Sequence, residues 1–341
     1  MTCGTSHRQR RGMALIAVMF FMLLAVTGVA TFLRRATVDG MVARNRDYAA
    51  RCEALARGGV HLATGLLLQD KLDEAEFGLA AETREELWAQ VGAVPIVTAD
   101  GGELRLHIED AGSRINLNSV ISDGAASHED LSEAFLAALL DRVVQEIPGA
   151  DEERSYDIEE LARNLLDYMD EDEVRIFGGS EDDYYLAQDP PYRAANRPLL
   201  SVDELALVEG FRPALVDALR PYVTVQPIHD AAGINPNTAP PWVLALLYHG
   251  TGDMRFASED TVRDVLELRE NGAILCSSET GEDCTSLGQA VDGEIFPPPG
   301  FVSDVFRVES VARYGDVERT VVVWIDRSEP AEPVWLAWDV R

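Results

Sequence analysis

The sequence predicts an α+β fold: a long N-terminal helix packs on an antiparallel sheet, and a large all-α block is inserted between strands of that sheet. Three observations lead to this prediction. An uncharged run of 21 residues near the N-terminus continues into an amphipathic helical pattern. Alternating apolar and polar residues, typical of half-buried strands, occur near residue 105 and again beyond residue 300. The chain between these regions has helical periodicity instead.

The uncharged run extends from Met13 to Leu33 and is long enough to cross a bilayer. A helix of this length spans roughly 32 Å, close to the thickness of a hydrocarbon core of about 30 Å. A secretory signal peptide has a shorter apolar run with a small-residue cleavage site after it, whereas here the small residue Gly12 precedes the run. We therefore expect a retained transmembrane helix. Arginines flank it on both sides, and we expect the N-terminus in the cytoplasm because a large acidic domain follows.

The helical pattern continues to about Gln69, because apolar residues recur every three or four positions from Val38 to Leu66. An unbroken helix from Met13 to Gln69 would be roughly 85 Å long. The sheet is expected to begin with "GELRLHIED", in which apolar and polar residues alternate. A strand pair is expected in "VFRVESVARYG" and "DVERTVVVWIDR", where Gly315-Asp316 between two alternating runs is a hairpin signal. The stretch "PVWLAWDVR" would add an edge strand.

The middle of the chain is expected to be an all-α block. Its segments each combine a cap or an acidic first turn with an apolar stripe, which is typical of helices. They are "HEDLSEAFLAALLDRVVQEI", "DIEELARNLLDYMD", "SVDELALV", "PALVDAL", "APPWVLALLY" and "SEDTVRDVLELREN".

Composition and motifs exclude several functions. The chain has a formal charge of −30, and the residues before Met13 contain three arginines and no acid, so the remainder carries −33. Such a domain does not attract nucleic acid or an anionic membrane surface. Two stretches, "LLSVDELALVEGF" and "INPNTAPPWVLALL", resemble helix-hairpin-helix (SAM-like) elements, but their acidic surroundings favour a packing role over DNA binding. The six histidines are scattered, and HExxH, GxSxG and Walker motifs are absent, so we expect no enzymatic activity.

Two of the four cysteines are expected to form a disulfide. Cys276 and Cys284 flank the polar loop "SSETGED". A bridge between them would close about nine residues and contribute roughly 2.5 kcal/mol in the chain-entropy account. It requires an oxidising compartment, and the alternative is a pair of free thiols. Cys52 lies on the helical pattern and is expected in the core.

A run of carboxylates predicts a cation site. The stretch "DYMDEDEVRIFGGSEDDYYL" contains eight acids and one cation, Arg175. Six to eight hard oxygen ligands suit Ca²⁺, which relieves the repulsion between such carboxylates. Gly178-Gly179 can fold the two acidic arms together. The spacing is not that of an EF-hand, because Arg175 stands where that loop requires glycine. The alternative is a solvated charge run, paired in part with Arg193 and Arg197.

Several stretches together resemble one known family. "RRGMALIAVMFFMLL" is similar to the class III leader of pilins and pseudopilins, which a prepilin peptidase cuts between Gly12 and Met13. "RINLNS", "DYMDEDE", "GSEDDYYL", "PPYRAANRPLLSVDEL" and "INPNTAPPWVLALL" resemble, in order, signature stretches of the minor pseudopilin GspK of bacterial type II secretion.

This resemblance implies a pilin-like helix and sheet with a large α-helical insertion that binds Ca²⁺. The expected organisation is a leader peptide (1–12), a transmembrane part of the helix (13–33), the amphipathic helix and first part of the pilin-like domain (34–122), the insertion (123–300) and the C-terminal strands (301–341). The candidate metal ligands carried over are Asp167, Asp170, Asp172, Glu181, Asp182 and Asp183.

The resemblance also implies a cellular location and binding partners. The chain would be a single-pass protein of the bacterial inner membrane with its globular domain in the periplasm, methylated after leader cleavage. It would contact other minor pseudopilins of the I and J type, and the major pseudopilin, through N-terminal helices in the tip complex that initiates and caps the pseudopilus. Ala17 would be the fifth residue after cleavage, where pilin-like families usually have Glu, and its methyl group favours a subunit with no neighbour above it. The alternatives are a bitopic periplasmic adaptor and a DNA-uptake protein.

Overall fold

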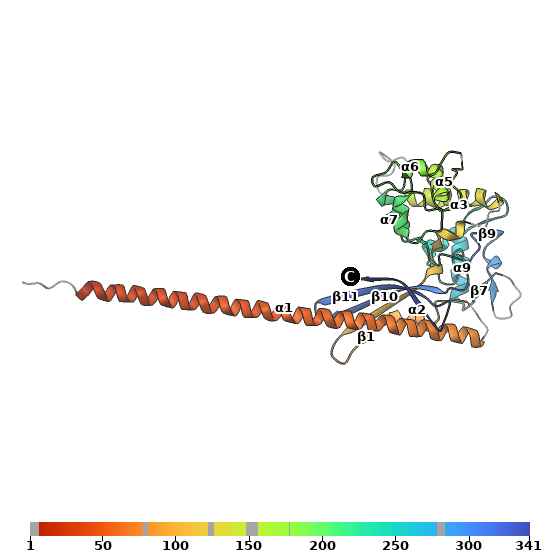
Figure 1. Ribbon diagram of the computed structural model, residues 1–341. Coiled ribbons are helices and arrows are strands. Elements are labelled where there is room, and N and C mark those ends of the chain that lie inside the picture. The colour runs from red at the N-terminus through yellow and green to blue at the C-terminus, as the bar shows by residue number, and fades with distance from the viewer. Residues whose placement is uncertain (1–6, 78–80, 122–125, 148–155, 177, 278–283) are drawn as a thin grey trace, which may run out of the picture.

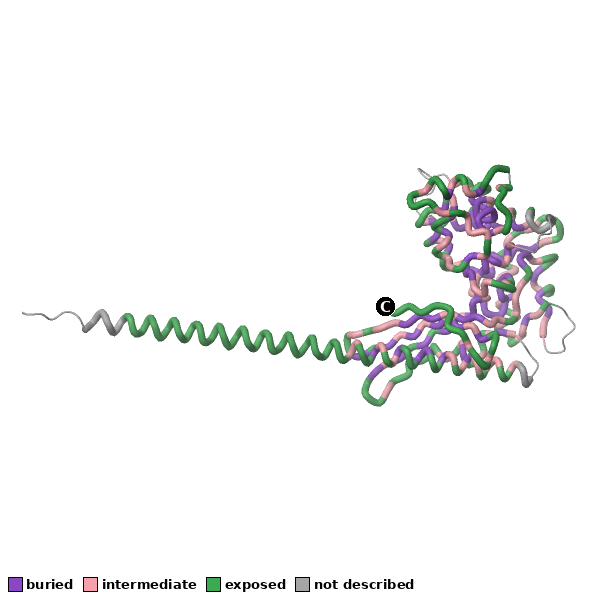
Figure 2. The backbone as a smooth tube through the Cα atoms, viewed as in Figure 1, coloured by how far each residue is buried: buried purple, intermediate pink, exposed green. Residues whose placement is uncertain are grey.

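The chain forms a long helix with a globular head at one end (Figure 1). The computed structural model describes residues 7–77, 81–121, 126–147, 156–176, 178–277 and 284–341. Helix α1 (His7–Phe77) is 71 residues long. Figure 2 shows its N-terminal part standing free of the head, with every residue from 13 to 47 exposed.

The free part of α1 carries the uncharged run. By length and composition it could cross a membrane, and 0% of its apolar window is buried in the described structure. Its threonines keep their hydroxyls satisfied within the helix: Thr27 and Thr31 donate to the carbonyls of Leu23 and Thr27, at 2.9 and 2.7 Å. Such internal bonds are what a helix needs in lipid, where water supplies no partner.

A five-stranded antiparallel sheet packs against the second half of α1. The strand order is β1-β2-β10-β11-β12. Gly315, at φ 59°, makes the hairpin turn between β10 and β11, as expected. The strands are β1 (Ile96–Val97), β2 (Glu103–Asp110), β10 (Val305–Tyr314), β11 (Val317–Asp326) and β12 (Val334–Val340). A short helix α2 (Leu87–Gln90) and a 3₁₀ turn (Val91–Ala93) precede β1.

One face of α1 is buried against this sheet. Residues spaced by three or four positions, Cys52, Ala56, Val60, Ala63 and Leu67, are 0% exposed. Gly59 allows the helix to approach closely, because a Cβ there would lie 2.2 Å from the hydroxyl oxygen of Ser310. That hydroxyl donates to the carbonyl of Ala56 at 2.8 Å and so fixes the helix on β10.

The edge strand β12 is exposed along its whole length. A register shift between Trp324 and Ile325 interrupts its pairing with β11, and Trp335 and Trp338 then contact each other with ring centroids 5.2 Å apart. Trp335 also contacts His61 of α1. The expected edge strand is thus present, and it is bulged as edge strands often are.

The insertion was expected to be all-α, but it also contains short strands. Its helices are α3 (Ala126–Val144), α5 (Ile158–Met169), α6 (Asp182–Tyr185), α7 (Pro213–Leu219), α8 (Pro241–Leu244) and α9 (Glu259–Glu270), with 3₁₀ turns at Ala111–Ser113, Leu117–Val120, Val202–Leu207 and Leu287–Gln289. Between them lie three small sheets formed by β3 (Ile115–Asn116) with β4 (Val223–Thr224), by β6 (Arg255–Phe256), β5 (Tyr248–Gly250) and β9 (Glu294–Phe296), and by β7 (Leu275–Cys276) with β8 (Thr285–Ser286). Strands of two or three residues are too short to show an alternating pattern. The segment predicted as the helix "SVDELALV" is a 3₁₀ helix, capped by the Ser201 hydroxyl.

The insertion also begins earlier than expected. Ile115, Leu117 and Val120, which precede the expected start of the insertion at 123, pack in its hydrophobic core with residues of α3 and α5. A second core lies between α1 and the sheet. Figure 1 shows the insertion at the end of the sheet farthest from the free part of α1.

Asp110 joins the two cores where β2 ends. It is 2% exposed and accepts hydrogen bonds from the amide of Asn235 at 3.0 Å, the hydroxyl of Thr238 at 2.5 Å and the backbone N–H of Gly112 at 2.7 Å. Burial raises the pKa of Asp110, and these donors together with Ser303 oppose that rise.

The stretches "INLN" and "INPN" contain the same arrangement of asparagine hydrogen bonds. In each, the first asparagine accepts from the backbone N–H of the second, at 3.0 Å. The second asparagine then bridges both backbone groups of a distant leucine: Asn118 holds Leu199 at 2.8 and 3.0 Å, and Asn237 holds Leu275 at the same distances. The polar side chains of both stretches therefore serve packing, because they satisfy buried backbone groups.

Replacing Asp110 should destabilise the whole head. Asp110→Ala removes an acceptor and leaves the side chains of Asn235 and Thr238 buried without their partner, which should cost about 3 kcal/mol. Urea unfolding of the detergent-solubilised chain measures this loss. Asp217→Ala, at an exposed side chain, is the matched control and should change stability by less than about 0.5 kcal/mol. Equal midpoints for the two variants would contradict the role given to Asp110.

Candidate metal centre

The acidic stretch folds into a hairpin between α5 and α6. Asp167 lies in the last turn of α5, Asp170 is its C-cap, and Glu181 is the N-cap of α6. An antiparallel bridge between Val174 and Ser180 closes the hairpin. Gly178 and Gly179 turn it with φ 84° and 106°, a backbone region that L side chains rarely adopt. The two glycines thus fold the acidic arms together, as the sequence suggested.

Three of the six candidate ligands converge. Asp167, Asp170 and Glu181 each place an oxygen atom within 4.8 Å of the others. Glu181 is 1% exposed, and neither of its carboxylate oxygens has a hydrogen-bond partner among the described residues. Because a buried carboxylate without partners is costly, this side chain is the feature of the cluster that best fits a bound cation.

The electrostatics of the cluster are those of an unneutralised acidic site. Burial, and then the charges of Asp170 and Asp167, raise the pKa of Glu181 to about 8. Burial also raises the pKa of Asp167, although the N–H of Ile176 donates to its carboxylate at 3.1 Å and opposes the rise. A divalent cation between these oxygens would replace repulsion by attraction and make the ionised forms favourable. The donor set of three carboxylates fits Ca²⁺.

The other three candidates lie outside the cluster. Asp182 pairs with Arg193 at 2.5 Å and accepts from the N–H of Ala194 at 3.2 Å. The carboxylate of Asp172 accepts from the N–H of Val174 at 2.7 Å. Asp183 is exposed at the surface of α6. These three acids border the site. The negative charges of Asp172 and Asp182 also raise the pKa of Glu181.

The loop that follows the acids covers their hairpin. Asn196, at φ 46°, donates its amide to the carbonyl of Asp172 and its backbone N–H to the carbonyl of Tyr168 at 3.0 Å. Its side-chain oxygen is buried without a partner among the described residues. The sequence gives no signal for the contact of Asn196 with the hairpin, because an uncharged side chain between Arg193 and Arg197 does not stand out. Arg197 in fact pairs with Glu204.

Aromatic side chains support the hairpin from the core side. The rings of Tyr168 and Tyr185 are buried with centroids 5.5 Å apart, and Tyr192 contacts Tyr185 at 5.4 Å. The tyrosines of "EDDYYL" and "PPY" therefore position the acidic arms by packing.

The remaining predicted sites are placed as follows. Cys276 and Cys284 are joined by a disulfide with Cα atoms 6.0 Å apart, and the loop 278–283 between them lies outside the described residues. Cys52 is a buried free cysteine, as expected. Gly12 and Met13 lie within α1, and the structure does not describe the surroundings of residues 7–12.

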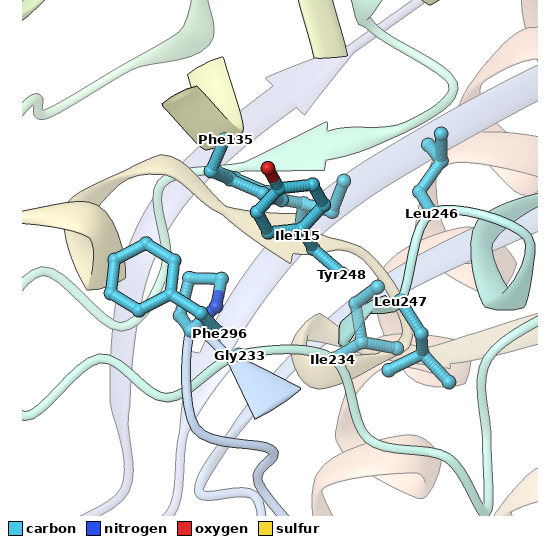
Figure 3. A pocket seen from close by; sticks show the side chains of 9 residues that line it. Ile115, Phe135, Gly233, Ile234, Leu246, Leu247, Tyr248 and Phe296 are labelled. Atoms are coloured by element: carbon cyan, nitrogen blue, oxygen red, sulfur yellow. The ribbon is translucent and has the colours of Figure 1, made fainter. Parts of the chain in front are cut away.

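An apolar pocket in the insertion core is too small for a ligand. Figure 3 shows its lining, with Ile115, Phe135 and Tyr248 on one side and Ile234 and Leu247 on another. Its volume is about 10 Å³, room for a single water at most. We interpret this pocket as a packing gap.

Comparison with known proteins supports the family resemblance seen in the sequence. A family model described as "Type II secretion system (T2SS), protein K" matches residues 113–228. The type II secretion system protein K of Klebsiella pneumoniae is 32% identical over 243 residues, covering 71% of this chain and 70% of the relative. The chain belongs to the type II secretion system protein K family. The protein K of Pseudomonas aeruginosa is 27% identical over 345 residues, covering 98% of this chain and 94% of the relative.

A solved structure confirms the fold class of this protein K family member. It is the crystal structure of the GspK-GspI-GspJ complex from the enterotoxigenic Escherichia coli type 2 secretion system, matched with a TM-score of 0.55, 21% identity and coverage of 90% of this chain and 99% of that chain. The predicted family is thereby confirmed, and with it a minor pseudopilin role in type II secretion.

Glu181 should make the metal-free protein less stable as pH rises. Its folded pKa of about 8 lies above its unfolded value, so the folded state holds the proton more tightly, and stability falls as pH rises from about 4.5 to about 8. At a given pH, Ca²⁺ at 100 times its dissociation constant should make the free energy of unfolding about 2.7 kcal/mol higher than it is in chelator. Thermal melting of the full chain in detergent, with Ca²⁺ and with chelator, measures both effects.

Glu181→Gln should reduce both the pH slope and the stabilisation by Ca²⁺, by the share that this cluster contributes. Asp183→Asn, at the exposed acid beside it, is the matched control and should retain both. Identical melting with Ca²⁺ and with chelator in the unsubstituted chain would exclude the site.

Proposed function

We propose that this chain forms, with minor pseudopilins of the I and J type, the tip complex that initiates and caps the pseudopilus and so supports protein export across the outer membrane. The observation that carries the proposal is the arrangement of α1: its apolar part stands free, and its other end holds the head. An apolar helix without contacts to its own head is available to a membrane and then to the helices of other subunits, including the major pseudopilin. The solved relative, a complex of GspK with GspI and GspJ, supports the choice of partners.

Before assembly the subunit is held in the inner membrane with its head in the periplasm. A prepilin peptidase removes residues 1–12, and the new N-terminus at Met13 is methylated. The disulfide between Cys276 and Cys284 suits an oxidising compartment such as the periplasm. The acidic head leaves no role for nucleic acid as a partner.

Two features favour the tip of the filament. Ala17 offers a methyl group where a carboxylate would pair with the N-terminal ammonium of a neighbouring subunit. The insertion lies at the far end of the head from the free part of α1 (Figure 1), where its bulk would obstruct a subunit stacked above. Ca²⁺ bound by Asp167, Asp170 and Glu181 would stabilise this exposed outer region. This role requires no enzymatic activity.

Ala17→Glu tests the tip position. If no subunit lies above this one, the added carboxylate finds no ammonium partner, so secretion and filament assembly should not improve over the unsubstituted chain. Ala25→Glu places the same group further along the apolar run and is the matched control for general insertion defects. Secretion of an exported enzyme and immunogold labelling of filaments are the measurements.

Labelling of the unsubstituted protein along the filament shaft would exclude the tip proposal. Mass spectrometry of the mature protein separates the filament subunit from a bitopic adaptor. An N-methylated Met13 supports the subunit, whereas an intact Met1 supports the adaptor.

A further inference from the structure

A second group of charged side chains is buried where the C-terminal part of α1 meets the end of β11. Arg327 is 0% exposed and follows β11 directly. Its guanidinium donates to the carboxylates of Asp70 at 2.6 Å and Glu74 at 2.7 Å, to that of Glu82, and to the carbonyl of Leu67 at 2.9 Å. The side chain therefore ties α1 to the segment that precedes α2.

The charges around Arg327 do not balance. Lys71 pairs with Glu74 at 3.4 Å and with Asp304 at 2.8 Å, so it supplies a second cation. The carboxylate of Glu86 accepts hydrogen bonds from two neutral donors, the backbone N–H of Thr83 at 3.0 Å and the indole N–H of Trp88. Within the described chain no cation pairs with Glu86. Against the two cations stand five carboxylates, those of Asp70, Glu74, Glu82, Glu86 and Asp304.

Three of these acids converge on one point. Asp70, Glu82 and Glu86 each place an oxygen within 4.8 Å of the others. Glu82 is 0% exposed, and its Oε2 atom has no hydrogen-bond partner among the residues that the structure describes. Burial raises the pKa of Glu82 to about 10 and that of Glu86 to about 7. A buried carboxylate with one oxygen that lacks a donor, beside two other carboxylates, is favourable to a further positive partner.

We propose that Asp70, Glu82 and Glu86 bind a divalent cation of the oxygen-preferring class, Ca²⁺, at a site separate from the one in the insertion. Three carboxylates supply hard oxygens at a spacing that one cation can span, with water completing the shell. The excess of three negative charges falls to one when the cation is bound. The Trp88 indole, which donates to Glu86, holds that ligand in place. The cation would fasten the end of α1 to the segment before α2 and leave Arg327 to bind the opposite side of Glu82.

Trp88 provides a readout specific to this site. Tb³⁺ replaces Ca²⁺ in oxygen sites and emits when a neighbouring indole transfers excitation to it. We expect the full chain in detergent to give tryptophan-sensitised Tb³⁺ emission that added Ca²⁺ quenches by displacement. Trp88→Phe removes the sensitising indole and should abolish that emission.

Ligand variants separate this site from the first one. Glu86→Gln leaves the contacts of Arg327 intact and should raise the Tb³⁺ concentration for half-maximal emission by about tenfold or more. Glu181→Gln should remove one bound Ca²⁺ without altering the sensitised emission. The proposal is overturned if the unsubstituted chain gives no sensitised emission, or if Glu86→Gln leaves the emission and its half-maximal concentration unchanged, as a shared proton in place of a cation would cause.

Discussion

The buried carboxylate of Asp110 determines how the two halves of the head are joined. One hydrophobic core lies between α1 and the sheet, the other lies within the insertion, and the chain passes between them at the end of β2. Asp110 lies at that crossing and binds Asn235 and Thr238, which are more than a hundred residues away in the sequence. Because directional hydrogen bonds to a buried charge tolerate little displacement, the insertion is held in one orientation on the pilin-like scaffold.

The two acidic clusters follow the same electrostatic logic in different parts of the head. In each, three carboxylates converge, and one of them, Glu181 or Glu82, is fully buried with an oxygen that lacks a donor. They differ in what surrounds them. The cluster in the insertion lies on a surface hairpin formed by a local stretch of chain, whereas the cluster near Arg327 joins α1, the segment before α2 and the end of β11. A cation bound at the first site would order a loop, and one bound at the second would connect secondary structure elements.

The sequence predicted those features that depend on local pattern. The continuation of the apolar run into an amphipathic helix, the hairpin at Gly315 and the meeting of Asp167 and Asp170 with Glu181 all follow from periodicity or from close spacing along the chain, although α1 extends past the expected Gln69 to Phe77. The short strands of the insertion were missed because two residues show no period. Asp182 was carried over as a candidate ligand from the family resemblance, and the charge run alone does not reveal that its carboxylate pairs with Arg193. The cluster around Arg327 could not be foreseen, because its ion pair with Asp70 joins residues 257 positions apart.

The free length of α1 also sets the distance between lipid and head. The apolar run ends at Leu33, and Tyr48 is the first residue of α1 that the head covers, so the helix between them spans roughly 22 Å. Electrostatic fields in physiological salt decay over about 8 Å. In the membrane-anchored state proposed above, the strongly acidic head would stand beyond the reach of anionic headgroups, while Arg34 and Arg35, directly after the apolar run, would remain near them. The head would then acquire its cations from bulk solution and not from the ion layer above the lipid, so its metal content would follow the composition of the surrounding fluid.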